Sequence, residues 1–508
     1  MAISVECFLL DPNHGGTLQS AIRQIVAEGI LAGRLRPGER MPSSRGLAEH
    51  LGVSRITVSL AYADLVADDF LTSKGRSGYF VSENAPQPGA FPHQPAQQGD
   101  QVDWARALGH RPSLERQNLG KPANWRDYRF PFVYGQADPS LFDHTNWRMC
   151  MLQALGHRNF ARMTDDLFEE DDPGLIEYIA RHTLPRRGIL ARSSEILVTL
   201  GAQNALWLTA QVLLNQRRTA GIEDPGYHGL RAILTQARCK VEPLPVGPQG
   251  LDPTSLPEGI DVLFCTPSHH CPTGATMPLE ARKALLAAAN AQNCLIVEDD
   301  YEFEIGGGRS PLPALKSLDQ QGRVIHVGSF SKSLFPGLRL GFLVGPEAFI
   351  SEARALRATV LRHPPGLLQR AAAHFLSLGH YDAMLRRLDR AFSERRSVML
   401  QAIAKHGLTI AGAAGDGGSS LWMRTPEGIS ATELALQLRE DSVLIEPGLP
   451  FFGSPPADDR FYRIAYSSIT SERIPDGIAR IARRLRRTSD HVHTRVAGQR
   501  PLNAGAAG

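Results

Sequence analysis

The feature that most constrains how this chain can fold is a stretch that cannot build a hydrophobic core. Residues 83–100 read ENAPQPGAFPHQPAQQGD, with four prolines, four glutamines and no periodic aliphatic residues. Segments of this composition stay extended and solvated, so the stretch is expected to link independently folded parts. Indistinct sequence continues to about residue 125. We therefore expect domains at residues 1–82 and 126–488, a linker at 83–125 and a disordered tail at 489–508.

The composition is that of an ordinary globular protein, with 42% hydrophobic and 21% charged residues in a chain of 508. This excludes a wholly disordered or collagen-like chain. The 55 basic residues exceed the 52 acidic ones so little that the formal charge is only +3. Any argument for nucleic-acid binding must therefore be local.

The cysteines and the apolar runs indicate a cellular compartment. Six cysteines are scattered without a CxxC pair, which argues against a disulfide framework and for a reducing environment. The first residues lack the basic region of a signal peptide, and no apolar run reaches the roughly 18 residues that a membrane helix needs. We expect a cytoplasmic protein that does not contact a membrane.

The C-terminal part alternates short apolar runs with helical patterns. Five runs are typical of buried strands, at residues 196–199, 262–265, 295–297, 324–327 and 340–344. Helical patterns between them include residues 202–214 and 279–290. Such alternation predicts an α/β fold with a mostly parallel sheet that is covered on both faces.

The N-terminal part has the pattern of a winged helix-turn-helix. Apolar residues at helical spacing occupy residues 17–31, and two further helices are expected at 45–50 and 55–68, each after a serine that can cap it. Residues 71–81 then indicate a hairpin with a Gly/Arg tip, which would be the wing. The arrangement is typical of DNA-binding proteins, although the pattern alone also fits a small helical domain that binds other proteins.

Two segments make this prediction more specific. Residues 36–45 (RPGERMPSSR) and 51–58 (LGVSRITV), with the wing, closely resemble the winged helix of GntR-type regulators. The resemblance covers nearly all of residues 17–82 and implies binding to double-stranded DNA. It implies contacts at the starts of the second and third helices and at the wing tip. The implied DNA-contacting residues are Ser44, Arg45, Ser54, Arg55, Thr57 and Arg76.

The most informative segment of the C-terminal part is SFSKSLFPGLRLG, residues 329–341. Its Lys332 follows an expected strand and is flanked by serines. A lysine in such a loop can form a Schiff base with an aldehyde. The hydroxyls and Arg339 suit a phosphate, so the whole set suits a phosphorylated aldehyde. A lone Ser-Lys pair would also fit an ordinary solvated lysine.

Other segments carry groups of the same chemistry. Residues 295–301 (LIVEDDY) are an expected strand that ends in carboxylates, at the sheet edge where ligands bind. A carboxylate there can keep a pyridine nitrogen protonated, although Asp299 or Asp300 could instead cap a helix. Residues 199–205 (TLGAQNA) join a strand to a helix through a turn whose N–H groups could hold a phosphate.

The order and spacing of these segments resemble the fold-type I aminotransferase family across about residues 130–485. The resemblance implies pyridoxal 5'-phosphate as the cofactor, with Lys332 as the lysine of the internal aldimine. The other implied cofactor contacts are Asp299 at the pyridine nitrogen, Tyr301 at the phenolic oxygen, Tyr227 stacked on the ring, and Ala202, Gln203, Ser329 and Arg339 at the phosphate. Arg463 falls where the family binds a substrate carboxylate, unless it forms an ion pair at the edge of a strand.

One position departs from the family. Many aminotransferases have Asn-Pro-Thr-Gly where this chain has Cys271 in HHCPTG, residues 269–274. His269 could replace the asparagine at the ring oxygen, but the change argues for weak transamination. The same histidines with Cys265 and Cys271 could suggest a metal site. The intervening Thr-Pro-Ser and the expected strand argue against it, so no metal is expected.

A winged helix, a Pro/Gln linker and an aminotransferase-like domain together resemble the MocR subfamily of GntR regulators. This implies a homodimeric, pyridoxal-phosphate-dependent transcriptional regulator. In it, an amino compound would react with the Lys332 aldimine and alter the DNA-binding domains. Two other functions remain open: an active aminotransferase that carries a DNA-binding module, and a sensor of pyridoxal phosphate itself.

Overall fold

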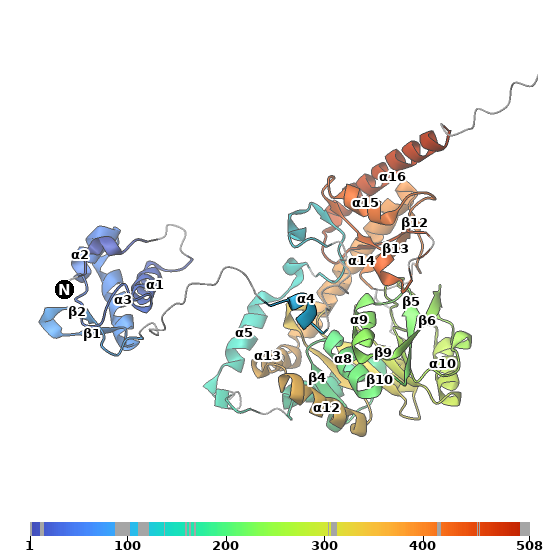
Figure 1. Ribbon diagram of the computed structural model, residues 1–508, viewed down its shortest axis with the longest axis horizontal. Helices are drawn as coiled ribbons and strands as arrows, with labels where there is room; N and C mark the ends of the chain where they lie inside the picture. The colour runs from blue at the N-terminus through green and yellow to red at the C-terminus, as the bar shows by residue number, and fades with distance from the viewer. Residues whose placement is uncertain are drawn as a thin grey trace, which may run out of the picture. The chain divides into compact units, whose positions relative to one another are not determined.

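The computed structural model describes residues 3–10, 15–86, 102–109, 121–136, 138–157, 160–161, 164–166, 169–302, 304–305, 312–413, 418–454, 456 and 458–497. The chain divides into two units, Met1–Gly109 and His110–Gly508 (Figure 1). Most of the expected linker, and the last residues of the expected tail, lie outside the described residues. Within the linker, residues Trp104–Ala107 form the short helix α4.

The first unit is a winged helix-turn-helix, as the sequence predicts. Its elements are α1 (Leu18–Leu31), α2 (Ser44–Leu51), α3 (Arg55–Ala67), β1 (Leu71–Ser73) and β2 (Tyr79–Val81). Strands β1 and β2 pair antiparallel to form the wing. Ser43 caps α2 and Ser54 caps α3, each by accepting a backbone N–H three residues on. The three helices meet through Ile22, Val26, Leu47, Val58 and Leu65, which are all buried.

The second unit is built on an eight-stranded sheet in the order β4-β11-β10-β9-β8-β5-β6-β7. The strands are β4 (Ile196–Thr199), β5 (Thr219–Asp224), β6 (Lys240–Gly247), β7 (Gly250–Leu251), β8 (Val262–Cys265), β9 (Leu295–Asp299), β10 (Val324–Ser329) and β11 (Gly341–Val344). The central strands are parallel, whereas β11 is antiparallel to both of its neighbours and β7 to β6. The expected α/β fold with a mostly parallel sheet is confirmed.

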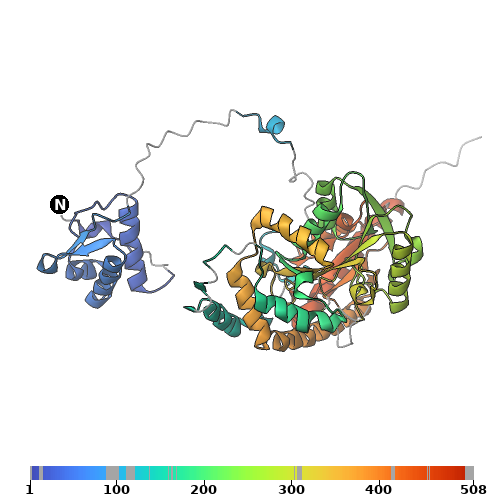
Figure 2. The ribbon, with the colours of Figure 1, turned by 90° about the horizontal axis from the view of Figure 1, so that it is seen from below.

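Helices cover both faces of this sheet (Figure 2). Strand β8 shows why, because Val262 and Phe264 enter one core, whereas Leu263 and Cys265 enter another. The first core includes α8 (Ala202–Leu213), α9 (His228–Ala237) and α12 (Glu347–Leu361), and the second includes α10 (Leu279–Ala291) and α11 (Leu315–Leu318). Strands with apolar residues on both sides therefore carry the parallel sheet.

A smaller antiparallel sheet follows in the order β12-β13-β16-β15. Its strands are β12 (Thr409–Ile410), β13 (Ser420–Arg424), β15 (Glu446–Pro447) and β16 (Phe461–Ala465), and β14 (Val443–Leu444) pairs separately with β3 (Phe130–Pro131). The remaining helices are α5 (His144–Ala154), α7 (Pro173–Tyr178), α13 (Gly366–Ser377), α14 (His380–His406), α15 (Ala431–Leu438) and α16 (Ile474–Ala497).

Helix α16 continues nine residues beyond position 488, where the sequence analysis placed the end of the domain. Residues 489–497 contain neither proline nor glycine, so nothing in them stops a helix before Gly498. Among the described residues, no helix combines the length and the apolar character needed to cross a bilayer. All six cysteines carry free thiols.

Candidate functional site

Lys332 lies in the loop after β10, at a small pocket that Glu302 and Ser331 also line. Its ammonium nitrogen is 4.4 Å from the centre of the Tyr134 ring. Gly135 has a positive φ of 71°, and a Cβ atom there would come within 2.5 Å of the same nitrogen. Desolvation lowers the pKa of Lys332, while Glu302 opposes the shift. The amine therefore loses its proton more readily than a solvated lysine does, which favours a nucleophile.

Asp299 ends β9 and lines a second pocket together with Tyr227 and Glu223. Its Oδ1 atom is buried and has no hydrogen-bond partner among the described residues. Burial, and then the neighbouring Asp300, raise the pKa of Asp299 to about 7. A buried carboxylate oxygen without a partner is costly unless a ligand donates to it. Asp299 thus has the environment expected of a group that binds a protonated ring nitrogen.

The start of α8 forms a cradle beside these pockets. Gly201 precedes the helix with a φ of 78°, and a Cβ atom there would lie 3.4 Å from Ser331 Oγ and 3.5 Å from Arg339 Cζ. The Ser331 hydroxyl is buried without a hydrogen-bond partner in the described part of the chain. Free N–H groups at the start of a helix attract anions, and they include those of Ala202 and Gln203.

Two predicted phosphate ligands make contacts within the protein. Ser329 Oγ accepts a hydrogen bond of 3.2 Å from the backbone N–H of Ser331. Exposed Arg339 donates to the carbonyl of Leu200 over 3.2 Å, in the turn that leads into α8. Both residues therefore lie beside the cradle, and their binding to a phosphate stays a prediction.

Tyr301 and Tyr227 pack against a small apolar cluster of Cys271, Trp422 and Phe451. The Tyr301 hydroxyl donates to the backbone carbonyl of His269 over 3.0 Å. Burial raises the pKa of Tyr227 to about 12 and also raises that of Tyr301. Both phenols therefore stay protonated and can donate hydrogen bonds at neutral pH.

Arg463 lies on β16 and forms the ion pair that the sequence analysis left open. Its Nε donates to Glu446 Oε2 over 2.8 Å, across the pairing of β15 with β16. Its Nη1 lies 3.7 Å from Cys271 Sγ. The guanidinium carbon is 3.9 Å from the centre of the Tyr134 ring, which is also the ring beside Lys332. Arg463 and Lys332 therefore both lie against the ring of Tyr134.

Several residues of this site escaped the sequence analysis. Glu302 is buried, accepts hydrogen bonds from Tyr134 (3.2 Å) and Ser419 (2.5 Å), and lies 3.7 Å from His269 Nε2. Tyr134 and Ser419 are far from it in sequence. The feature of the sequence that could have indicated Glu302 as a site residue is its position directly after Tyr301.

The two histidines of the HHCPTG segment each face a carboxylate. His269 faces Glu302, and His270 Nε2 lies 3.6 Å from Glu223 Oε2. Burial lowers the pKa of His270 to about 3 and raises that of Glu223 to about 8. Both groups of the second pair are therefore neutral at pH 7.

The predicted DNA-contacting residues lie at the helix starts and the wing of the first unit. Arg55 Nε donates to Ser44 Oγ over 3.4 Å, which connects α3 to α2. The Ser54 and Thr57 hydroxyls are 2.8 Å apart at the start of α3. Arg45 is exposed on α2, and Arg76 is exposed in the turn between β1 and β2. Ile56 was not predicted from the sequence, and its side chain is 71% exposed beside Arg55.

Two family models match the chain. The model for "Aminotransferase class I and II" matches residues 172–481, and the model for "Bacterial regulatory proteins, gntR family" matches residues 18–81. The two matches fall on the two units described above. They agree with the resemblances found in the sequence.

Known proteins resemble the chain over most of its length. It is 58% identical over 488 residues to the HTH-type transcriptional regulator TauR of Rhodobacter capsulatus, a match that covers 96% of this chain and 100% of that protein. It is 31% identical to the probable rhizopine catabolism regulatory protein MocR of Rhizobium meliloti, covering 92% and 94%.

A solved structure resembles the second unit. The crystal structure of LysN, an α-aminoadipate aminotransferase from Thermus thermophilus complexed with N-(5'-phosphopyridoxyl)-L-leucine, superposes with a TM-score of 0.69. It is 27% identical and covers 77% of this chain and 100% of that one.

Proposed function

The chain belongs to the MocR-type transcriptional regulators, in which a gntR-family helix-turn-helix domain is joined to an aminotransferase class I and II domain. From this premise we propose that it is a DNA-binding regulator that uses pyridoxal 5'-phosphate to sense an amino compound. The observation that carries the proposal is the combination, in one chain, of an exposed helix-turn-helix face with a half-buried, desolvated lysine among anion-binding groups.

The residues present fit this cofactor. Asp299 offers a buried, unpaired carboxylate oxygen, Ser331 offers an unpaired hydroxyl within the described residues, and the start of α8 offers free N–H groups. When bound, pyridoxal phosphate supplies an aldehyde that reacts with primary amines and a ring that withdraws electrons. Lys332 is the amine that holds it, and Asp299 the carboxylate that keeps its ring nitrogen protonated. Ala202, Gln203, Ser329 and Arg339 bind its phosphate, with Tyr227 and Tyr301 at the ring.

Arg463 gives the effector its second recognition group. Its charge is retained at any physiological pH, since Glu446 and the surrounding groups raise its pKa further. The rings of Tyr134 and Phe451 lie 3.9 Å and 4.7 Å from the guanidinium carbon. A flat, buried cation between aromatic rings suits a carboxylate or sulfonate. We therefore expect an effector that carries an amino group and an acidic group.

The DNA side of the proposal rests on α3. The acidic residue within α3 and the one at its C-cap are occupied elsewhere, because Asp64 accepts from Gln19 (2.7 Å) and Asp68 pairs with Arg23 (2.7 Å). Neither of these two carboxylates therefore competes for the face that begins with Arg55 and Ile56. The family match supports double-stranded DNA as its partner, and a homodimer would present two such helices to two half-sites.

In this proposal the effector competes with Lys332 for the cofactor. An effector can shift the second unit between two conformations only if it binds one of them more tightly than the other. The DNA-binding domains must then respond to that shift. The domain limits at residues 82 and 125 belong to the same proposal, whereas the second domain extends past residue 488 to the end of α16.

The test is a spectral titration of the cofactor-loaded protein with amino acids, aminosulfonates and simple amines, with and without a 2-oxo acid. We expect one spectral change without turnover, together with altered affinity for a DNA duplex selected by the protein from random sequences. Repeated turnover with product accumulation would indicate an aminotransferase instead. DNA affinity that follows only cofactor loading would indicate a sensor of pyridoxal phosphate. Arg55→Ala should weaken DNA binding by about 1–3 kcal/mol and leave cofactor loading unchanged.

A further inference from the structure

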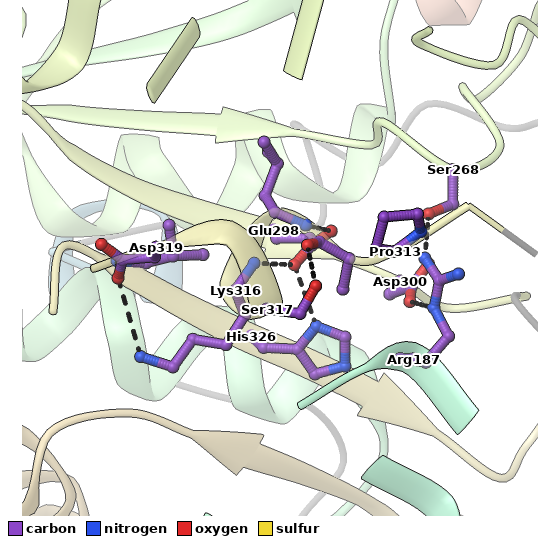
Figure 3. A network of polar contacts seen from close by, with 12 residues as sticks. Arg187, Ser268, Glu298, Asp300, Pro313, Lys316, Ser317, Asp319 and His326 are labelled. Atoms are coloured by element: carbon purple, nitrogen blue, oxygen red, sulfur yellow. Dashed lines mark hydrogen bonds and ion pairs between the residues drawn. The ribbon is translucent and has the colours of Figure 1, made fainter. Parts of the chain in front are cut away.

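Arg187 is a fully buried arginine at the end of the turn Leu184–Arg187, and it connects three segments (Figure 3). Its Nε donates to Asp300 Oδ2 over 2.7 Å, and its Nη2 donates to Ser268 Oγ over 2.6 Å. Its Nη1 donates to the carbonyl of Leu312. One guanidinium therefore holds the residue after β9, the loop after β8 and the segment before α11.

The neighbours of these contacts are residues of the cofactor site. Asp300 directly follows Asp299, and Ser268 directly precedes His269, whose carbonyl accepts from Tyr301. A shift of either segment would move a group that the proposed function assigns to the cofactor ring. The position of Arg187 thus bears on the site although the residue lines neither of the two pockets described above.

The charge balance around Asp300 depends on the same contact. The side chains of Arg187 and Asp300 are 1% and 0% exposed, and Asp300 Oδ1 has no hydrogen-bond partner in the described part of the chain. Asp300 is also one of the two main influences that raise the pKa of Asp299. Without the guanidinium, a buried carboxylate would face Asp299 uncompensated.

Glu298, Asp300 and His326 are close enough to share a metal ion, but their contacts argue for an ion-pair network. The two oxygens of Glu298 accept the backbone N–H groups of Leu315 (2.7 Å) and Lys316 (3.0 Å). His326 Nδ1 lies 3.2 Å from Glu298, and Asp300 holds Arg187. Most of the oxygens that a metal would need are already in use.

We propose that Arg187 is a positioning residue of the cofactor site: it fixes the ends of β8 and β9 relative to each other and neutralises Asp300 beside Asp299. The inference rests on the proposed function, because it assigns Asp299 and the 268–271 loop to the cofactor. Arg187 itself touches neither the cofactor nor the effector in this proposal.

The chain offers a matched control in Arg282, which is also fully buried. Arg282 donates to the backbone carbonyls of Met277, Pro313 and Pro267 at 3.0, 2.9 and 2.9 Å. It thus bridges the same two loops as Arg187, but its hydrogen bonds go to neutral carbonyls. Loss of Arg282 should destabilise the fold without breaking an ion pair to Asp300, because Arg282 acts on Asp300 only through its charge and donates no hydrogen bond to it.

The experiment compares full-length wild type with Arg187→Met, Asp300→Asn, the double variant, and Arg282→Met with and without Asp300→Asn. Titration of each cofactor-free protein with pyridoxal phosphate, followed by visible absorption, gives its dissociation constant. We expect Arg187→Met to weaken cofactor binding at least tenfold, and Asp300→Asn to recover much of that loss in the double variant. Asp300→Asn should recover far less in the Arg282→Met background, because Arg282 donates no hydrogen bond to Asp300.

A second measurement separates this inference from the proposed function. The thermal midpoints of the same proteins without cofactor should show the same selective rescue, because the Arg187–Asp300 pair exists without a ligand. If wild type failed to bind pyridoxal phosphate, the proposed function would fall, yet the midpoints would still test the charge balance. Equal defects in Arg187→Met and its double variant, in both measurements, would overturn the inference. Wild-type cofactor affinity in Arg187→Met would do the same.

Discussion

Glu446 accepts a hydrogen bond of 2.8 Å from Arg463 Nε where β15 and β16 are paired, and both side chains are buried. The ion pair fixes the guanidinium and occupies its Nε edge. Nη1 also lies 3.7 Å from Cys271 Sγ, so Nη2 and the second N–H bond of Nη1 are the groups left to recognise an anion beside Lys332 and Tyr134. Arg463 can therefore stabilise the fold through Glu446 and still bind an acidic group of the effector.

We expect Arg463→Met to retain cofactor binding. It should need at least tenfold higher concentrations of amino acids and aminosulfonates to give the same spectral change. The response to simple amines should change little, because they carry no acidic group. Breaking a buried pair also costs roughly 3–5 kcal/mol of stability, since Glu446 is left charged. The double variant Arg463→Met/Glu446→Gln removes that charge and should regain stability without regaining the response. Equal losses for acidic and simple amines would argue against an anion site.

Lys332→Ala should abolish covalent attachment of the cofactor. The amine of Lys332 is desolvated and has a lowered pKa, so it is the nucleophile that the loop provides. Borohydride reduction of cofactor-loaded wild type, followed by peptide mass spectrometry, should place the cofactor on the peptide that contains Lys332. The variant should give no modified peptide but should still bind DNA. Modification of a different lysine in wild type would refute the assignment.

Much of the fold and part of the site could be predicted because their signals are local. The expected strands at residues 196–199 and 262–265 match β4 and β8 residue for residue, since short apolar runs between turns are typical of buried strands. Lys332, Asp299 and Gly201 lie in short segments whose residue types already suggest their chemistry.

The remainder of the site depends on contacts between distant residues. Tyr134 meets Glu302 across 168 positions, and Arg187 meets Asp300 across 113. A single sequence does not indicate which arginine or tyrosine, far away along the chain, will line a given pocket in the folded protein. The two-residue strands β12, β14 and β15 also escaped prediction, because so few residues carry no periodicity.

Ile56 should read a thymine methyl group in the DNA. Its side chain is 71% exposed and Leu60, one turn further along α3, is 48% exposed. The major groove offers the thymine methyl as its apolar partner. In a duplex selected by the protein, we expect uracil in place of the contacted thymine to weaken wild-type binding about fourfold, since a buried methyl-sized group contributes roughly 0.8 kcal/mol. Ile56→Ala should bind the thymine and uracil duplexes equally. An Ile56→Ala variant that still prefers thymine at every position would contradict this prediction.

Glu304 should make the second unit less stable as the pH rises. Burial raises its pKa to about 7, against hydrogen bonds from Tyr381 and Ser333 that lower it. The folded protein then keeps a proton that the unfolded chain releases above about pH 4.5, so the free energy of unfolding falls between that pH and about 7. The fall amounts to roughly 1.4 kcal/mol for each pH unit in that interval. Glu304→Gln resembles the protonated form. It should match wild type at pH 5 and exceed it at pH 8 when urea unfolding is followed by circular dichroism.

Tyr381→Phe is the matched control for Glu304. Tyr381 donates to the Glu304 carboxylate and lies 2.6 Å from Ser333 Oγ. Its hydroxyl lowers the pKa of Glu304, so its removal should raise that pKa further and make the loss of stability with pH larger. Asp299 and Glu223 also have raised pKa values and contribute to the slope of every variant. The difference between curves therefore isolates Glu304, and parallel curves for wild type and Glu304→Gln would show that its carboxyl is ionised in the folded protein.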